Sequence, residues 1–259
     1  MKKITTYSAI ALSTLLLFTA CNKNNEHNNN ETHHTKHWGY TGDVSPSHWG
    51  ELSEDFKMCS QGKMQTPINV IPTKDIDLPE LNIDYKTGSK SIIDNGHSVQ
   101  VNIKDGSVLK IDGQNYKLKQ FHFHTPSENN INSKSFPLEA HFVHATDDGK
   151  LAVVAVMFKE GAENPTLAKI WKRMPKLERG KEAKCGLSSE QVNSLMPKNR
   201  DYYKFMGSLT TPPCSEHVKW FVYKTPLTVS KAQASQFTAQ FGHPNNRPIQ
   251  PTNKREIDE

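Results

Sequence analysis

Short stretches in which apolar residues dominate or alternate with polar ones recur along the chain from Trp38 onward. Successive side chains of a strand point to opposite faces, so these stretches predict β-strands, several of them buried on both faces. The predicted strands cover residues 99–103, 108–111, 116–124, 138–145, 151–158 and 218–223. Between them, Asn-Gly and Asp-Gly pairs favour turns at 95–96, 105–106, 112–113 and 148–149.

Helical signals are fewer and shorter. Asn164 before Pro165 predicts a helix that runs to Trp171, because asparagine caps a helix start and proline suits the first helical position. Capping-box patterns predict two further helix starts, at Ser188 and at Ser230, each with a glutamine three residues on. No repeat, linker or shift of composition interrupts the chain after residue 38. These signals together predict one mainly β (α+β) domain with small peripheral helices.

The first twenty residues have the pattern of a secretory signal. Lys2 and Lys3 precede an apolar stretch at 4–18 that is short for a membrane span. The stretch leads through small residues into Cys21, which resembles a bacterial lipoprotein signal. We therefore expect Cys21 to be the lipidated N-terminus of an exported protein, periplasmic or at the cell surface. Phe18 stands where such signals usually have leucine, and cleavage by an ordinary signal peptidase is the alternative.

The segment at 21–36 is rich in asparagine and histidine and almost free of apolar side chains. Because it has little apolar surface to bury, it predicts a flexible tether between the lipid anchor and a domain at 37–259. Its histidines, with His37 beside them, could chelate a metal loosely, and a solvated polar tract is the simpler interpretation.

The charges argue against some classes of partner. The 32 basic and 27 acidic side chains, a net charge of +5, are spread along the chain, which gives nucleic-acid binding little support. No apolar run near 18 residues follows the signal, so we expect contact with a membrane only through the lipid anchor. Removal of residues 1–20 takes away two lysines and no acid, so the net charge falls from +5 to +3.

The chain has 12 histidines, and three of them have the pattern of a metal site. Side chains alternate in a strand, so His122 and His124 lie on one strand face, about 7 Å apart. On a second predicted strand, His141 shares a face with Glu139. If the two strands are adjacent, three imidazole nitrogens converge, which is the ligand set of a catalytic zinc whose fourth position stays open to water.

Two side chains are placed to support such a site. Gln120 and Glu139 each lie two residues from a candidate ligand on the same strand face, where they can accept the distal N–H of a liganding ring. His144 faces the other way, as expected of a hydrogen-bonded core histidine. The alternative for a lone His-x-His pair is a polar stripe on a half-exposed strand. The flanking phenylalanines and the third histidine beside Glu139 favour the metal site.

Six motifs resemble one known family. In chain order they are WGY, NGH, QFHFHTPSE, PLEAHFVH, GSLTTPPC and NNRPIQ. They are similar to motifs of the α-class carbonic anhydrases, most closely the bacterial periplasmic members, over roughly residues 38–250. The resemblance implies a large, twisted, mostly antiparallel central sheet with zinc at the bottom of a conical cleft. It also implies reversible hydration of carbon dioxide to bicarbonate and a proton by zinc-bound hydroxide, and inhibition by sulfonamides and anions.

The resemblance carries a set of roles over to this sequence. The zinc ligands match His122, His124 and His141. Their hydrogen-bond partners match Gln120 and Glu139. The substrate pocket, with the apolar wall where carbon dioxide rests, matches Val143, Val153, Leu209, Thr211 and Trp220.

The resemblance also implies the remaining catalytic groups. Thr210 matches the hydroxyl that accepts a hydrogen bond from zinc-bound hydroxide and donates its own to the buried carboxylate of Glu128. An ionised carboxylate can only accept, so this pairing turns a threonine lone pair toward the hydroxide. His97 matches the proton shuttle, since an imidazole with an ordinary pKa of about 6.5 can relay protons, whereas by sequence alone it is a solvated histidine beside a turn. Tyr40 matches a residue that orders the water chain.

Cys59 and Cys214 match the disulfide positions of the bacterial members, which leaves Cys185 free if Cys21 carries lipid. Such a bridge closes a loop of about 155 residues and would stabilise the fold by up to ~5 kcal/mol, so reduction should affect stability more than chemistry. Asn129 departs from the histidine that is common at its position, which affects local packing and no catalytic group. The sequence leaves a homodimer open.

Two other functions are alternatives. Relatives that have lost ligand histidines act as catalytically silent binding or adhesion modules, but this chain keeps all three ligands together with Thr210 and Glu128. A zinc hydrolase such as an esterase would use the same hydroxide, and ester turnover fits better as a side reaction of it.

Overall fold

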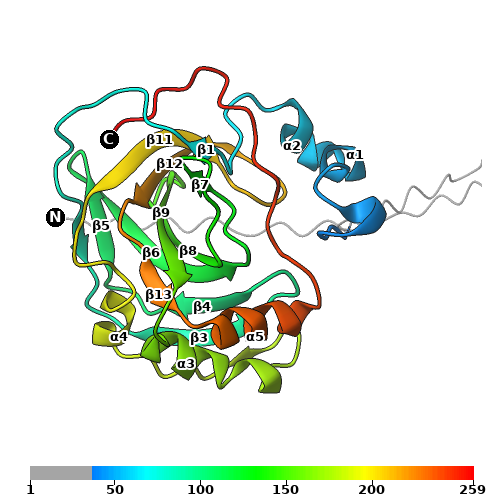
Figure 1. Cartoon of the computed structure of the whole chain (residues 1–259), viewed down its shortest axis with the longest axis vertical. Helices are drawn as coiled ribbons and strands as arrows, with labels where there is room; N and C mark the ends of the chain where they lie inside the picture. The colour runs from blue at the N-terminus through cyan, green and yellow to red at the C-terminus, as the bar shows by residue number, and fades with distance from the viewer. Residues whose placement is uncertain (1–36) are drawn as a thin grey trace, which may run out of the picture. The chain divides into compact units, whose positions relative to one another are not determined.

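The computed structural model describes residues 37–259, and its main feature is an eleven-stranded sheet (Figure 1). The main path through the sheet is β10 (Glu182–Ala183), β3 (Ser89–Asp94), β4 (Val99–Ile103), β6 (Gln114–His124), β8 (Leu138–Ala145), β9 (Leu151–Glu160), β12 (Glu216–Tyr223) and β11 (Tyr202–Ser208). Off this path, β5 (Val108–Ile111) joins β6 to β2 (Asn82–Asp84), and β13 (Leu227–Val229) pairs with β9. In this sheet only the pairings of β9 with β12 and β13 are parallel, so the expected mostly antiparallel sheet is confirmed.

All six predicted strands are present, and the predicted turn chemistry explains how two of them connect. Asp112 and Gly113 form the two-residue turn between β5 and β6, with φ angles of 51° and 76°. Both central residues of a type I′ hairpin turn need positive φ, which aspartate tolerates and glycine adopts without strain. A further short parallel pair joins β1 (Asn69–Val70) to β7 (Asn130–Ile131) outside the main sheet.

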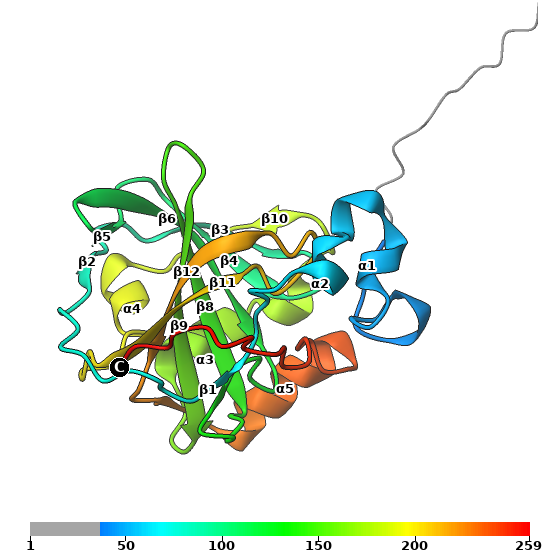
Figure 2. The ribbon, with the colours of Figure 1, turned by 90° about the horizontal axis from the view of Figure 1, so that it is seen from above.

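The helices begin where the capping signals predict. Asn164 accepts hydrogen bonds from the first turn of α3 (Pro165–Trp171), and complete capping boxes start α4 (Ser189–Asn193) and α5 (Lys231–Phe241). The sequence patterns missed two one-turn helices, α1 (Trp49–Leu52) and α2 (Met58–Gln61), and three 3₁₀ turns at Gly42–Val44, Glu54–Phe56 and Met174–Lys176. Helices α3 and α5 lie on the β3 and β4 side of the sheet (Figure 1), and α1 and α2 lie together, apart from α3 and α5, in both views (Figures 1 and 2).

The strand β3 shows why some strands escaped prediction. Ser89 and Ser91 are buried in it, where apolar side chains would have marked an inward face. Each serine is instead satisfied by a hydrogen bond: Ser89 Oγ accepts from Leu187 N at 2.8 Å, and Ser91 Oγ accepts from Asn102 Nδ2 at 2.9 Å. Because hydrogen-bonded serines can occupy buried positions, the sequence of β3 lacks the alternation of apolar and polar residues that predicts a strand.

Apolar clusters cover both faces of the central strands. Alternate residues of β9 contribute to each: Val154, Val156 and Phe158 to a larger cluster that includes the buried faces of α3 and α5, and Val153, Ala155 and Met157 to a smaller one around Trp220. Burial of a side chain as large as Phe158 stabilises the fold by about 1.5–3 kcal/mol. The two clusters therefore hold β6, β8 and β9 rigidly in register.

Residues 37–259 fall within one compact unit, as the single-domain prediction requires. The signal expected at 1–20, the lipidation expected at Cys21 and the tether expected at 21–36 lie outside the described residues and stay predictions. Within residues 37–259, no helix has the length and apolar character needed to cross a membrane.

Candidate metal centre

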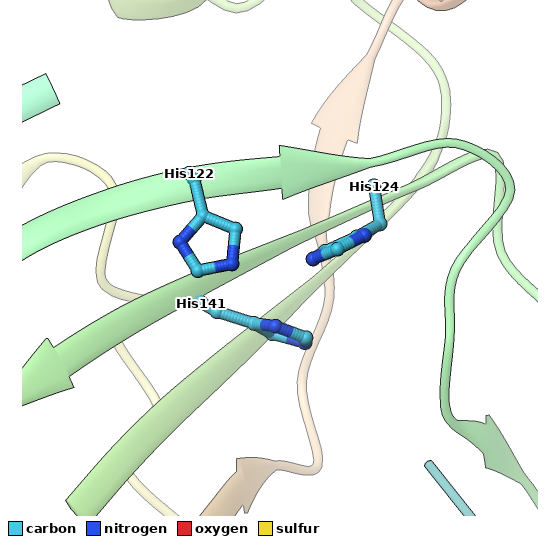
Figure 3. A group of neighbouring side chains, drawn as sticks. All are labelled: His122, His124 and His141. Carbon is cyan, nitrogen blue, oxygen red and sulfur yellow. The ribbon is translucent and has the colours of Figure 1, made fainter. Parts of the chain in front are cut away.

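Three histidines from two neighbouring strands converge at one point (Figure 3). His122 and His124 project from β6, and His141 projects from β8, where it lies directly opposite His122 in the antiparallel register. The ring centroids are 4.7–5.4 Å apart, and one nitrogen from each ring lies within 4.8 Å of the other two. The adjacency of the two strands, which the sequence left conditional, is therefore present.

Hydrogen bonds fix the orientation of two of the rings. His122 Nδ1 lies 2.8 Å from Gln120 Oε1, and His124 Nδ1 lies 2.7 Å from the backbone carbonyl oxygen of Asn245. A carbonyl oxygen can only accept, so Nδ1 of each ring carries the proton. The Nε2 atoms of His122 and His124 are then left with free lone pairs, as metal ligation requires.

The third ring faces a carboxylate. His141 Nε2 lies 2.9 Å from Glu139 Oε1, although its N–H does not point at that oxygen well enough to count as a hydrogen bond. A small rotation of the His141 ring would align its Nε2–H with Glu139 Oε1. A proton on Nε2 would leave Nδ1 of His141 as the donor to a metal.

Burial keeps all three rings neutral. His124 and His141 are 1% and 2% exposed, and His122 is half-buried. Burial lowers the pKa of His122, His124 and His141, and for His122 the two neighbouring histidines add to this effect, while the Asn245 carbonyl opposes it for His124. Neutral imidazoles offer lone pairs to a metal without competition from protons.

The donor set fits a zinc ion. It consists of three imidazole nitrogens, and His124 Nε2 is buried with no hydrogen-bond partner, an arrangement that is costly unless something else binds there. Tetrahedral zinc at 2.0–2.1 Å from each nitrogen places the nitrogens about 3.4 Å apart, compared with at most 4.8 Å between them here. Three ligands leave a fourth position free.

A second buried carboxylate lies beside the triad. Glu128 Oε2 is 3.4 Å from His124 Nε2, and Glu128 Oε1 accepts a hydrogen bond from the backbone N–H of Arg247 at 2.8 Å. Burial raises the pKa of Glu128 to about 8, and the hydrogen bond from Arg247 and the nearby Thr210 hydroxyl oppose this rise. Thr210 is thus close to Glu128, but Glu128 Oε2 has no hydrogen bond of normal geometry in this structure.

His97, the expected proton shuttle, lies in the turn between β3 and β4 and stacks on Trp38. Its pKa is lowered to about 4, first by burial and then by His37 and Arg179, while Asp94 opposes the change. The ordinary pKa near 6.5 that the sequence suggested therefore does not apply to this ring, because partial burial, to which the stacked Trp38 contributes, disfavours its charged form.

The aromatic surroundings of His97 include Tyr40. The two rings lie 6.4 Å apart, and burial, with a smaller effect of the Glu128 charge, raises the pKa of Tyr40 well above its ordinary value. The Tyr40 hydroxyl therefore keeps its proton at any physiological pH and can act as a donor.

Four of the residues expected to line the substrate pocket belong to or pack against one apolar cluster, which reaches the triad at Trp220. Val153 and Trp220 belong to the smaller apolar cluster, and Val143 and Leu209 are partly buried against it. The Trp220 and His141 rings pack edge to face, with centroids 4.9 Å apart. Thr211 is half-exposed next to Leu209 and Thr210 in the chain. One side of the triad is therefore apolar.

A disulfide joins Cys59, in α2, to Cys214, with their Cα atoms 5.0 Å apart. Cys185 is free and buried, and burial raises the pKa of its thiol. These are the pairing and the leftover cysteine that the family resemblance implied. The backbone N–H of Cys214 donates to Thr211 O at 2.8 Å, so the bridge anchors the turn that follows Thr210.

Sequence reasoning missed three contributors to the site. Asn245 supplies its carbonyl to His124, Arg247 supplies its backbone N–H to Glu128, and Asn129 donates to Glu139. The buried Arg247 guanidinium also donates to the carbonyls of Thr66 and Cys59. The motif NNRPIQ contains Asn245 and Arg247. Both contribute main-chain atoms, which every residue type has, so the residue type does not indicate the role.

Comparisons with known proteins agree with this geometry. The model of the family "Eukaryotic-type carbonic anhydrase" matches residues 44–259. Carbonic anhydrases of Pectobacterium carotovorum and Neisseria gonorrhoeae are both 46% identical to this chain, over 222 and 223 residues; each match covers 85% of this chain and 90% or 87% of the relative. The structure of α-carbonic anhydrase from Thermovibrio ammonificans with the inhibitor sulfanilamide has a TM-score of 0.82 and 42% identity, and the match covers 86% of this chain and 99% of that one.

The three-histidine site and the matches over most of the chain lead to one assignment: the chain belongs to the eukaryotic-type, or α-class, carbonic anhydrase family.

Proposed function

We propose that this protein catalyses the zinc-dependent, reversible hydration of carbon dioxide to bicarbonate and a proton. The observation that carries the proposal is the convergence of three neutral imidazoles beside an apolar wall. When bound, zinc supplies Lewis acidity, which in carbonic anhydrases, the reference example of this effect, lowers the pKa of a coordinated water to about 7.

His122, His124 and His141 would hold the ion through one nitrogen each. Gln120 and the Asn245 carbonyl keep the Nδ1 protons of two rings in place, so their Nε2 atoms stay available as ligands. Because hydrogen bonds already orient these two rings, little of their ordering entropy would be lost when the ion binds.

Thr210 and Glu128 would orient the nucleophile. A Glu128 carboxylate that is ionised in the zinc-loaded enzyme accepts the Thr210 proton, so Thr210 offers only a lone pair to the attacking oxygen. The nucleophile's own lone pair then faces the substrate. Val143, Leu209 and Trp220 would hold carbon dioxide next to it by weak apolar contacts, which favours reaction through proximity.

His97 would carry the product proton toward solvent, with Tyr40 ordering water between the ring and the site. With a pKa of about 4, the ring is neutral at pH 7 and can accept a proton, which it then loses readily to buffer. Acceptance of the proton is therefore the slower half of the relay.

The cellular setting is part of the proposal. The N-terminal pattern supports export by a signal at 1–20, lipidation at Cys21 and membrane contact through that anchor alone, at the periplasm or cell surface. Sulfonamides and anions would inhibit by occupying the open metal position. The complex of the Thermovibrio ammonificans enzyme with the inhibitor sulfanilamide supports inhibition by a sulfonamide. Slow ester hydrolysis would be a side reaction, and both a monomer and a homodimer are compatible with the site.

Replacement of one ligand tests the function. His122→Ala should lose stoichiometric zinc and nearly all hydration of carbon dioxide, while His48→Ala, a change at an exposed histidine outside the site, should keep both. The result also separates an enzyme from an adhesion module, because a module would keep its binding without the metal. Full hydration activity of His122→Ala would refute the proposed site.

A further inference from the structure

The carboxylate of Glu139 is held by an unusual number of donors. It is completely buried, and it accepts hydrogen bonds from the backbone N–H of Glu128 at 2.7 Å, from the backbone N–H of Asn129 at 2.9 Å and from the Asn129 side-chain amide at 2.8 Å. Two of the three donors belong to Asn129. A buried carboxylate is costly without such partners, so Asn129 is a main reason that Glu139 can occupy this position.

The side chain of Asn129 has only one workable orientation. Its Oδ1 accepts a hydrogen bond from the backbone N–H of Ile68 at 3.0 Å, and a backbone N–H cannot accept in return. Nδ2 must therefore face Glu139. The main-chain carbonyl oxygen of Asn129 also accepts a hydrogen bond, from Ser127 Oγ at 2.8 Å. Asn129 is 0% exposed, so bulk water does not compete for these bonds.

The oxygen that Asn129 holds is the one that faces the metal site. Glu139 Oε1 accepts from Asn129 Nδ2 and lies 2.9 Å from His141 Nε2. A carboxylate at this distance keeps the imidazole proton on Nε2 and leaves Nδ1 of His141 toward the point where the three rings meet. A continuous chain of contacts thus leads from Ile68 through Asn129 and Glu139 to His141.

We infer that Asn129 is a positioning residue for the metal centre: its side-chain amide holds Glu139 against His141 and thereby slows the loss of zinc. The inference rests on the proposed function in taking zinc as the bound ion. The asparagine that departs from the family's common histidine is thus a working part of the site, since each side chain offers an N–H donor as well as an acceptor.

The test measures zinc release from purified, zinc-loaded protein mixed with excess chelator, followed by the colour of the chelator complex. Asn129→Leu keeps a similar shape but has no donor, and it should release zinc about 10-fold faster than wild type, the lower end of the effect of losing a partner behind a ligand. Asn129→His restores a donor and an acceptor and should return the rate toward wild type.

A control separates this effect from general loss of stability. Asn193 Nδ2 donates to Tyr85 O and Ser189 O, in a part of the fold with no contact to the triad. Asn193→Ala should lower the melting temperature of the metal-free protein and leave zinc release unchanged. Equal acceleration in Asn193→Ala and Asn129→Leu would overturn the inference, because any destabilised fold would then release zinc faster.

The remaining outcomes are equally decisive. Zinc release at the wild-type rate from Asn129→Leu, or from Asn129→Ala if the leucine variant does not fold, would overturn the inference while leaving the proposed function intact. So would an Asn129→His variant as fast as Asn129→Leu. A wild-type protein that holds no stoichiometric zinc would instead overturn the proposed function, and the inference with it.

Discussion

The imidazole of His97 lies flat against the indole of Trp38, with ring centroids 3.6 Å apart and planes 9° from parallel. Stacking covers one face of the ring, and burial is the largest cause of its low pKa, about 4, with His37 and Arg179 adding to it. The residue proposed to export protons is therefore a weaker base than a solvated histidine.

Trp38→Ala should raise the pKa of His97 toward 6.5, because the ring would regain water. The pKa can be followed by NMR as a function of pH. Proton export in dilute buffer should become faster as well, since a stronger base accepts the proton more readily. Arg179→Gln removes a charge but no stacking and should raise the pKa less. An unchanged pKa in Trp38→Ala would contradict the role assigned to stacking.

Glu128→Gln should stabilise the metal-free protein at pH 7. The folded-state pKa of Glu128 is raised to about 8 from an ordinary 4.5, so its protonated form favours the fold at low pH, and this stability is lost as the pH rises toward 8. Glutamine stays neutral, so the variant should gain about 3 kcal/mol at pH 7 and less than ~1 kcal/mol at pH 5. Urea unfolding at both pH values measures this gain.

The same change should lower hydration by about 100-fold, because a neutral amide can donate as well as accept and no longer fixes the direction of the Thr210 hydroxyl. Equal stability of wild type and Glu128→Gln at pH 5 and pH 7, or full activity of the variant, would show that Glu128 does not have the role described.

Loss of the Cys59–Cys214 bridge should destabilise the protein more than it slows the reaction. The bridge spans 155 residues, and the constraint it places on the unfolded chain is worth up to ~5 kcal/mol. Cys59→Ala/Cys214→Ala should therefore unfold at a clearly lower urea concentration, while hydration measured well below the unfolding temperature stays within a few-fold of wild type. An unchanged unfolding midpoint would contradict this expectation.

Val143→Phe should block the apolar side of the site. Val143 lies two residues after His141 on β8 and is only partly buried, so a larger side chain would extend toward the space next to the triad. We expect kcat/KM for carbon dioxide to fall by about 100-fold with zinc content unchanged, because the substrate can no longer approach closely. Ile83→Phe, at a partly buried position in β2 that packs against the larger apolar cluster, is the control and should keep near-normal activity.

The triad was predictable because its signal is local. His122 and His124 are two residues apart in a strand, and strand alternation by itself puts them on one face. His141 needed one further fact, the pairing of β6 with β8, which residue patterns suggest but do not determine. The capping boxes at Ser188 and Ser230 were equally local, and both helices begin there.

The parts that could not be predicted depend on distant segments. The Asn245 carbonyl reaches His124 across 121 residues, and the pKa of His97 depends on the stacking of Trp38. Neither contact follows from residue type or periodicity, because both are set by how loops meet in the folded chain. The family motifs included Asn245, but they could not say which of its atoms matters.

If His122, His124 and His141 hold a zinc ion that makes this protein a carbon dioxide hydratase, hydration must depend on that ion. The rate of hydration can be measured by stopped flow on one preparation as purified, after zinc removal with a chelator and after zinc is added back. We predict about one zinc per chain, loss of activity on its removal and recovery on its return. Activity that survives complete removal of zinc, or a zinc-loaded protein that does not hydrate carbon dioxide, would contradict the claim.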